Sequence, residues 1–174
     1  MTLFTNIINF NEIDSTNNYI KANHRQLAEF TVVKANFQTN GRGQFDRVWE
    51  ANPGENLLFS LLFKTPVAKL NPILISSLIS TLKELGLSPH FKAPNDIYIK
   101  DQKIAGILVE TKYDENQLVY MVAGIGLNVN QTEFGPLKAT SIKQVVGESY
   151  DLNIVLKKIL NYIEHSLILI QMME

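Results

Sequence analysis

Hydrophobic residues are spaced along this chain in two ways, one typical of strands and one typical of helices. Residues 56–64 are almost continuously apolar, which predicts a strand buried on both faces. Residues 72–85 instead place leucine or isoleucine every three or four positions and are followed by Gly86, which predicts an amphipathic helix that ends at a glycine. Residues 153–172 repeat this helical spacing and predict a second long helix.

The remaining apolar segments are shorter. They predict strands over 6–13, 30–35, 97–100, 103–110 and 117–129, and helices over 16–29 and 141–146. In the first of these helices, Ile20, Leu27 and Ala28 would face the core, and a turn is predicted at residues 101–102. Because the strands arrive in pairs with few helices between them, we expect an α/β (α+β) fold. In this fold helices flank a mixed β-sheet, and residues 1–174 form one domain.

The last predicted helix ends in a segment, Leu167 to Ile170, that is apolar on nearly every side. Burial in the ordinary core is our preferred interpretation. The alternative is that this segment packs against a partner or against a further domain absent from this chain.

The composition excludes several classes of protein. The chain has 174 residues, of which 45% are hydrophobic and 19% charged, and its formal net charge is −1. These values are ordinary for a soluble domain and argue against nucleic-acid binding through a broad basic surface. The absence of cysteine excludes disulfides, thiolate metal sites and cysteine nucleophiles. No apolar run is long enough to predict a membrane span, and no signal peptide is expected at the first residues, so a cytoplasmic location is the default expectation.

The most unusual stretch is residues 38–49, hereafter the arginine–glycine loop. Gly41 and Gly43 bracket Arg42, and Arg47 and the only tryptophan follow. Such a loop is costly to order, because glycine loses more backbone freedom on folding than other residues. Its two guanidinium groups suit carboxylate or phosphate oxygens. We therefore expect the loop to close over an anionic ligand.

A second polar cluster surrounds Pro94, where Asn95 and Asp96 precede a short strand. Asp96 is the candidate Mg²⁺ ligand, because Mg²⁺ is usually held by one or two carboxylates together with substrate phosphates. On the returning strand, Lys103 must either reach solvent or meet an anion. Gly106 inside the same apolar strand indicates close approach of a ligand or of another strand.

Ser15 and Thr16 lie where a helix should begin. Capping is the preferred interpretation of these hydroxyl groups, although hydroxyls at a helix N-terminus can also bind a polar ligand. The candidate polar residues thus lie in four segments. These are Ser15 and Thr16; Gln38, Arg42 and Arg47; Asn95, Asp96 and Lys103; and Asn128. Taken singly, each residue has an ordinary structural explanation, since a strand lysine is usually exposed and an aspartate often forms a turn. Taken together, they favour a nucleotide-using enzyme.

Several common motifs are absent. Residues 124–126 read Gly-Ile-Gly, but the third glycine of a dinucleotide fingerprint is replaced by Val129, and the segment has a strand pattern where a helix should begin. The chain has no phosphate-binding P-loop and no Gly-x-Ser-x-Gly nucleophile elbow. Its three histidines lie in unrelated segments and form no metal-binding pattern.

Four motifs, in order, resemble those of the biotin–protein ligases. They are the arginine–glycine loop ending in Trp49, Lys92-x-Pro94-Asn95-Asp96, Lys103-x-x-Gly106-Ile107-Leu108-x-Glu110 and Gly124-x-Gly126-x-Asn128. The resemblance extends over residues 15–141, most of the chain. It implies the catalytic domain of that family, a mixed β-sheet with helices on one side that is related to class II aminoacyl-tRNA synthetases.

The resemblance also implies a two-step reaction. Biotin carboxylate attacks the α-phosphate of ATP to give biotinyl-5′-AMP and pyrophosphate. A lysine of the biotin carboxyl carrier protein, a part of acetyl-CoA carboxylase or a related carboxylase, then attacks the mixed anhydride. The implied substrates are ATP and biotin, and the implied cofactor is Mg²⁺.

By the same resemblance, individual residues receive roles. Lys103 and Arg42 would be the catalytic residues, close to the biotin carboxylate and the phosphate. The residues that would bind biotin are Ser15, Thr16, Gln38, Gly41, Arg42, Lys103 and Gly106. The residues that would bind ATP are Arg47, Trp49, Asn95 and Asn128, and the metal ligand would be Asp96.

The chain departs from the family pattern at three positions. The family usually has arginine where Gln44 stands, glycine where Asp46 stands and tryptophan where Ala93 stands. The small C-terminal β-domain that is common in the family and the N-terminal DNA-binding helix-turn-helix of its repressor type are not recognised in these residues. We therefore expect no DNA binding.

Two other functions would account for part of the pattern. A lipoate–protein ligase has a related fold and the same adenylate chemistry, but its loop usually carries paired arginines before a glycine run. A non-catalytic module that binds biotin or an adenylate is the alternative from another class, and Lys103 argues against it because ligand storage does not require that cation. A homodimer through an edge strand is compatible with the sequence, although nothing in the sequence shows it.

Overall fold

The protein is described by a computed structural model over residues 2–173. Its centre is a seven-stranded sheet with the strand order β1-β2-β3-β7-β6-β5-β4. The strands are β1 (Ile7–Ile13), β2 (Val32–Gln38), β3 (Leu57–Phe63), β4 (Pro89–Lys92), β5 (Asp96–Ile99), β6 (Gln102–Asp114) and β7 (Gln117–Leu127). The helices are α1 (Thr16–Asn23), α2 (Leu70–Glu84), α3 (Ile142–Val146) and α4 (Leu152–Met173), with a 3-10 turn η1 at Gln44–Asp46.

The sheet is mixed, as predicted. β1 runs parallel to β2, because α1 forms the crossover between them, and the other neighbouring pairs are antiparallel. The antiparallel pairs can be joined by short turns, which explains why strands follow one another in the sequence without a helix between them. The expected fold class is therefore confirmed.

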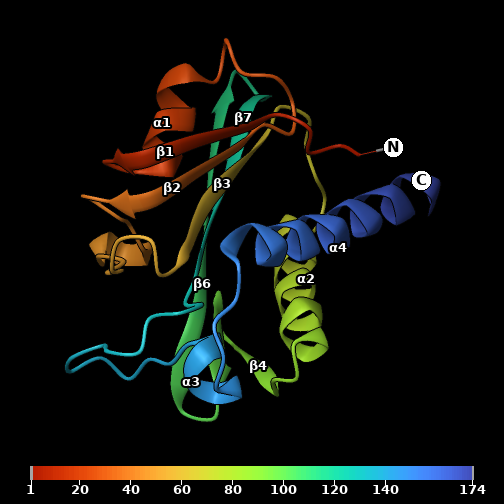
Figure 1. The fold of residues 1–174 in the computed structure, drawn as a ribbon. Helices are drawn as coiled ribbons and strands as arrows, with labels where there is room; N and C mark the ends of the chain where they lie inside the picture. Colours follow the sequence, from red (N-terminus) through yellow and green to blue (C-terminus); the bar gives the residue numbers. More distant parts are fainter. Residues whose placement is uncertain (1, 174) are drawn as a thin grey trace.

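Helices cover both faces of this sheet (Figure 1). α2 and α4 pack against each other and against the larger core, whereas α1 lies on the opposite face over a smaller core centred on Ile20, Val33 and Leu62. The arrangement with helices on one side, which the resemblance implied, is thus wrong for α1. β3 lies between the two cores and is buried along its whole length, as its continuous apolar sequence predicted.

The first helix is shorter than predicted. α1 ends at Asn23 instead of residue 29, so Ile20 is fully buried whereas Leu27 is only partly buried and Ala28 is exposed. Residues 22–26 offer no large apolar side chain to pack against the sheet. The Asn23 side chain also donates to the Tyr19 carbonyl, an alternative to continuing the helix.

Several strand boundaries also differ from the prediction; β6, for example, continues to Asp114 and β7 ends at Leu127. β2 begins at Val32, because Phe30 adopts a left-handed conformation with φ 61°, and it continues to Gln38, which delivers Gln38 directly to the arginine–glycine loop. The turn between β5 and β6 lies at Lys100 and Asp101, one residue earlier than predicted. Lys100 takes the left-handed conformation there, with φ 53°.

The last turns of α4 are partly buried and partly exposed. Ile163 and Leu167 are buried, as core burial predicts, but Ile168, Leu169 and Met172 are exposed. Figure 1 shows the last turns of α4 extending past α2. Among the described residues, no helix is both long and apolar enough to cross a membrane.

Candidate active site

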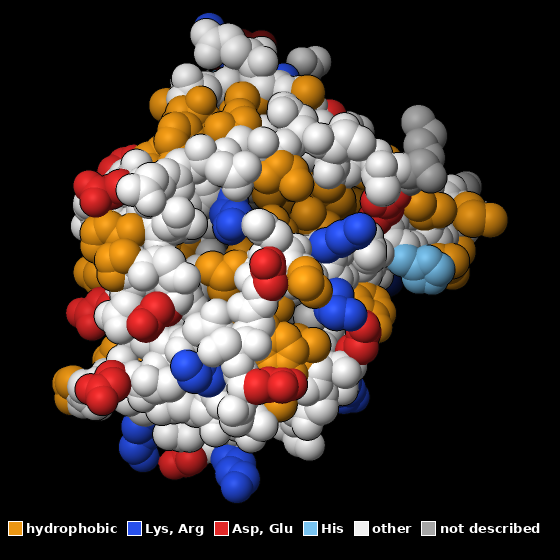
Figure 2. Space-filling view, viewed as in Figure 1, with side chains coloured by type: hydrophobic (Ala, Val, Ile, Leu, Met, Phe, Trp, Pro, Cys, Tyr) orange, Lys and Arg blue, Asp and Glu red, His pale blue; other side chains and the backbone are white. Residues whose placement is uncertain are grey.

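A cavity of ≈ 340 Å³ lies between the start of α1, the arginine–glycine loop and strands β5, β6 and β7. This volume is within the range of small-molecule sites, about 300–1,000 Å³. The predicted site residues that line it are Ser15, Thr16, Gln38, Arg42, Arg47, Trp49, Asn95, Asp96, Lys103 and Gly106. Gly41 and Asn128 do not line it. On the face shown in Figure 2, basic and acidic side chains are interspersed and form no broad basic surface.

The arginine–glycine loop folds as a narrow hairpin. The Trp49 N–H donates to the Gly41 carbonyl at 3.0 Å, Arg42 pairs with Val48, and the Gly43 N–H donates to the Arg47 carbonyl at 2.7 Å. A Cβ at position 41 would lie 2.6 Å from the Trp49 carbonyl oxygen, so glycine is required there for the two arms to meet. The observed role of Gly41 is to close the loop.

The tip of this loop carries backbone strain. Phe45 and Asp46 both adopt the left-handed conformation, with φ 55° and 58°. Such a conformation costs a non-glycine residue about 1–2 kcal/mol. Glycine, the residue the family usually has at position 46, would adopt it without that cost. Asp46 is exposed and does not line the cavity.

Trp49 lies on a floor made of glycines. Gly106 of β6 and Gly126 of β7 are paired in register, and a Cβ at Gly126 would lie 2.5 Å from Trp49 Cε2. A Cβ at Gly106 would lie 3.1 Å from Trp49 Cζ3. The two glycines therefore make room for the indole ring. The indole Nε1 is buried and has no hydrogen-bond partner among the described residues.

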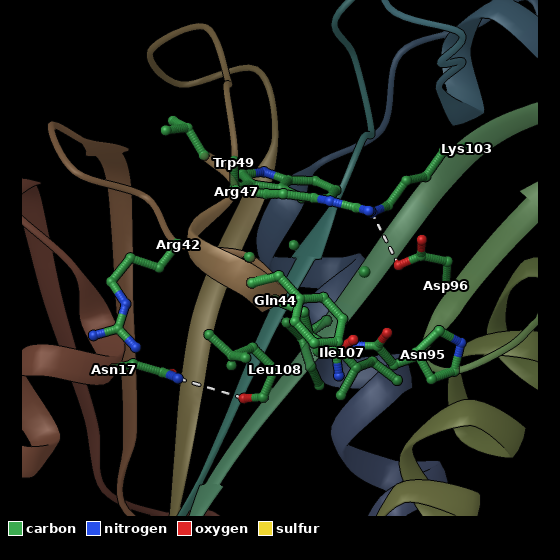
Figure 3. Close-up of a pocket in the computed structure, with 18 of the residues that line it drawn as sticks. Asn17, Arg42, Gln44, Arg47, Trp49, Asn95, Asp96, Lys103, Ile107 and Leu108 are labelled. Atoms are coloured by element: carbon green, nitrogen blue, oxygen red, sulfur yellow. Dashed lines mark hydrogen bonds and ion pairs between the residues drawn. The ribbon is translucent and has the colours of Figure 1, made fainter.

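One side of the cavity carries the pair Lys103 and Asp96. Lys103 Nζ lies 2.9 Å from Asp96 Oδ1 and 5.3 Å from the centre of the Trp49 ring. Figure 3 shows the two charged side chains pointing toward one another. The pair is partly exposed, so solvent weakens its mutual attraction and leaves both groups able to exchange partners with a ligand.

The opposite side carries Arg42, which is bound to Glu110 of β6. Arg42 Nη2 lies 2.5 Å from Glu110 Oε1, Lys21 Nζ lies 2.8 Å from the same oxygen, and Asn17 Nδ2 donates to Glu110 Oε2 at 2.9 Å. Burial opposes ionisation of Glu110, but the hydrogen bonds from Lys21, Asn17 and Arg42 outweigh it and hold the pKa below its ordinary value. Figure 3 shows Arg42 directed toward Asn17 and away from Lys103.

The charge of Glu110 should be visible in the pH dependence of stability. A carboxylate with a pKa depressed by folding contributes stability that is complete above its unfolded pKa and is lost as pH falls through its folded pKa. For Glu110 this window begins at its ordinary value of 4.5 and extends downward. We expect the stability difference between wild type and Glu110→Gln, measured by urea unfolding, to shrink below that pH. A constant difference through the window would contradict this assignment.

A chain of hydrogen bonds leads from Glu110 to Thr16 and Gln38, which form the polar floor of the cavity. Ser60 Oγ donates to Asn17 Oδ1 at 2.5 Å, Ser60 Oγ lies 2.7 Å from Thr16 Oγ1, and Thr16 Oγ1 lies 3.1 Å from Gln38 Oε1. The Thr16 N–H also donates to Gln38 Oε1, at 2.8 Å. Ser15 caps α1 by accepting from the Asn18 N–H, which confirms the capping interpretation.

With this geometry established, sequence comparison identifies the family. Residues 10–128 match the model described as the biotin/lipoate A/B protein ligase family. The match includes the arginine–glycine loop and both strands that carry the glycine floor. This chain belongs to that family.

Individual members show how far the similarity extends. The bifunctional ligase/repressor BirA of Bacillus subtilis is 35% identical over 143 residues, which are 76% of this chain and 44% of that protein. The biotin--[acetyl-CoA-carboxylase] ligase of Mycobacterium tuberculosis is 28% identical over 149 residues, 79% of this chain and 54% of that protein. The chain thus spans about half the length of these curated relatives.

Solved structures of the ligase family agree with the fold. A biotin protein ligase from Aquifex aeolicus, in complex with biotin and ATP, has a TM-score of 0.82 and 31% identity, covering 94% of this chain and 71% of that chain. A putative lipoate protein ligase from T. acidophilum with bound lipoic acid has a TM-score of 0.65 at 12% identity, which shows a shared fold alone.

Two residues predicted to bind ATP are engaged elsewhere in this ligase-family chain. Asn95 is buried and its side chain donates to the Ile107 carbonyl, which fastens the start of β5 to β6. Asn128 donates to the Thr140 carbonyl at 3.1 Å, and its buried Oδ1 has no partner among the described residues. Their roles toward ATP remain predictions.

Asp96 is the single carboxylate that lines the cavity, and no cluster of three potential metal ligands occurs among residues 2–173. This is compatible with Mg²⁺, which binds one or two carboxylates and completes its shell with phosphate oxygens and water. It does not suit a metal held by protein ligands alone, such as structural zinc.

The sequence did not identify Asn17, Ser60 and Glu110 as parts of one network. A signal was available at Gly124, a glycine within an apolar strand. A Cβ at that position would lie 2.5 Å from Asn17 Oδ1. The rule that indicated close approach at Gly106 therefore applies equally to Gly124.

Proposed function

We propose that this chain is the catalytic domain of an ATP-dependent biotin–protein ligase. The observation that carries the proposal is the arrangement of Lys103 within the cavity. A cation paired with Asp96 lies on one side, and the polar floor of buried Thr16 and half-buried Gln38 belongs to the same cavity. A ligand with a polar ring at one end and a carboxylate at the other fits such a site.

In the first step, a carboxylate oxygen of biotin forms a bond to the α-phosphorus of ATP. The bond from that phosphorus to the bridging oxygen breaks, and pyrophosphate leaves. Two anions must approach one another, so charge repulsion is a large part of the barrier. Lys103 would stabilise the charge on the carboxylate and α-phosphate oxygens, and Arg47, at the exposed rim, would bind the phosphates of ATP.

Arg42 would contribute only after a change of partner. Its guanidinium is bound to Glu110 and Asn18 in this structure. To reach an anion in the cavity, it would have to exchange these bonds for bonds to a carboxylate or phosphate. The hairpin that carries Arg42 would then order over the adenylate and keep water from the mixed anhydride.

Mg²⁺ would be held by Asp96 together with phosphate oxygens, and it would supply charge neutralisation at those phosphates. In the second step, a lysine amine of a biotin carboxyl carrier protein attacks the acyl carbon. The acyl–phosphate bond breaks, AMP leaves and the nitrogen loses a proton. A cytoplasmic location, the absence of DNA binding and pairing of copies through an edge strand remain predictions.

The proposal can be tested with the chain alone. Trp49 is the only tryptophan and lines the cavity, so its fluorescence should report ligand binding. We expect a saturable change with biotin and none with lipoate at equal concentration, and biotin-dependent exchange of labelled pyrophosphate into ATP. Exchange supported by lipoate but not by biotin would assign a lipoate–protein ligase. Binding of biotin without exchange would indicate a non-catalytic module.

A further inference from the structure

The network that starts at Glu110 has a direction, because hydrogen bonds have donors and acceptors. An ionised carboxylate can only accept. Its two oxygens accept from Lys21 and Arg42 on one side and from Asn17 on the other. The depressed pKa of Glu110 keeps it in this acceptor state at neutral pH.

We propose that Glu110 is a positioning residue that fixes the hydrogen-bond direction across the pocket floor, so that Thr16 and Gln38 both offer acceptors to the ligand. It would thereby make the pocket specific for a ring that carries N–H donors. This inference deepens the proposed function and rests on it for the identity of the ring.

The first link is the orientation of the Asn17 amide. Its Nδ2 faces two acceptors, Glu110 Oε2 at 2.9 Å and the Leu108 carbonyl at 3.4 Å. Turning the amide over would place Oδ1 against a carboxylate. With Nδ2 toward Glu110, Oδ1 must face Ser60, whose hydroxyl therefore donates to it at 2.5 Å.

The second link is the pair of hydroxyls. Ser60 has one proton and gives it to Asn17, so the 2.7 Å contact with Thr16 requires Thr16 to donate to Ser60. Thr16 could instead donate to Gln38 Oε1 at 3.1 Å. That alternative would leave the two hydroxyl oxygens 2.7 Å apart with no proton between them, a closer and more repulsive contact than the 3.1 Å contact of Thr16 with Gln38. The carboxylate therefore directs the Ser60 proton to Asn17, and the shorter hydroxyl contact then directs the Thr16 proton to Ser60.

The consequence lies at the floor of the cavity. With its proton directed to Ser60, Thr16 Oγ1 keeps a lone pair free, and Gln38 Oε1 then accepts only from the Thr16 N–H, at 2.8 Å. Two acceptors then face one another at 3.1 Å with no proton between them. An N–H group placed against them satisfies both. A cyclic urea such as that of biotin supplies this donor, whereas a dithiolane ring has none.

Glu110→Gln should reverse the whole chain. The amide oxygen of glutamine would face Lys21 and Arg42, which leaves its Nε2 facing Asn17. Asn17 would turn over and donate to Ser60, Ser60 would donate to Thr16, and Thr16 would donate to Gln38. The acceptors at the floor would then be occupied by protein donors, although no residue that lines the cavity has been changed.

The experiment compares biotin with two lactam analogues, each with one ring N–H replaced by CH₂, by calorimetric titration. For wild type, we expect one analogue to bind at least roughly ten-fold more weakly than biotin. The N–H that this analogue lacks is the one that would satisfy the Thr16 and Gln38 acceptors. In Glu110→Gln this preference should fall to roughly two-fold or less, mainly through weaker biotin binding. A loosened fold would weaken the binding of all three ligands equally and leave the ratio of their affinities unchanged. An unchanged ratio in Glu110→Gln would overturn the inference.

Two further variants test whether the effect travels along the hydrogen-bond relay, which runs from Glu110 through Asn17 and Ser60 to Thr16. Lys21→Gln removes one ion pair of Glu110 but leaves the carboxylate facing Asn17, so the wild-type ratio should persist. Ser60→Ala interrupts the chain between Asn17 and Thr16 and should lower the ratio as Glu110→Gln does, which provides the test if Glu110→Gln fails to fold. If wild type binds none of the ligands, the proposed function fails. If wild type prefers biotin and both relay variants keep that preference, the relay alone is wrong.

Discussion

Replacement of Lys103 by alanine is expected to lower the rate of biotin-dependent adenylate formation by roughly 10²–10³-fold, the loss seen when one preorganised donor to a developing anion is removed. Lys103 is the cation on the Asp96 side of the cavity, paired at 2.9 Å and lying over the Trp49 ring. Without it, the carboxylate and α-phosphate oxygens would lose the cation that offsets their charge. Pyrophosphate exchange measures the loss.

The fold should survive this substitution, because Lys103 is partly exposed and Asp96 retains access to solvent. Lys92 offers a matched control. It also lines the cavity, but its Nζ lies over the Tyr98 ring at 4.4 Å. Lys92→Ala should therefore cost far less than Lys103→Ala. Equal losses in the two variants would show that general positive charge, not the position of Lys103, matters, and normal exchange in Lys103→Ala would remove the proposed mechanism.

Gly126→Ala is the second substitution with a large expected effect. Its Cβ would lie 2.5 Å from Trp49 Cε2 and 2.7 Å from Cζ2, closer than atoms can approach. The indole must shift, and with it the arm of the hairpin that carries Arg47. Overpacking of this kind costs about 1–3 kcal/mol, so we expect KM for ATP to rise roughly ten-fold or more.

A double-mutant cycle can assign this effect to the indole. In a Trp49→Ala background the space above Gly126 is open, so adding Gly126→Ala should raise KM for ATP little further. The biotin affinity, measured by calorimetry, should change less than KM for ATP, because the added Cβ meets Trp49 whereas Thr16 and Gln38 lie at the start of α1 and the end of β2. Additive effects of the two substitutions would show that Gly126 acts through something other than Trp49.

The sequence predicted the sheet and most of the site because both follow from local signals. The apolar run of β3 and the helical spacing of α2 reflect burial that each segment requires by itself. The end of α1 was predicted wrongly because it depends on tertiary packing. The pattern predicted a helix through residues 24–28, but of these residues only Leu27 packs against the smaller core, and the helix ends at Asn23.

The same distinction holds for the site. Lys103, Asp96 and Trp49 stand out as residue types at unusual positions, and the structure brings them together. The relay through Asn17 and Ser60 could not be predicted, because its members are common residues that meet only when β3, β6 and α1 are assembled. Gly124 alone carried a signal for it.

The arginine–glycine loop is more structured than its sequence suggested. Its closure over an anion remains a prediction, and the structure shows a hairpin whose Arg42 is bound to Glu110. The strain at Phe45 and Asp46 places the least stable part of the loop at its tip. A loop with a firm base and a strained tip can exchange partners without losing its attachment to the sheet.

We propose that this chain transfers biotin to protein. The most direct measurement is mass spectrometry of a biotin carboxyl carrier domain incubated with the chain, ATP, Mg²⁺ and biotin, with wild type and Lys103→Ala side by side. We expect the carrier to gain the mass of one biotin, on its acceptor lysine, with wild type and not with the variant. An unmodified carrier after incubation with a wild-type chain that binds biotin would contradict this proposal.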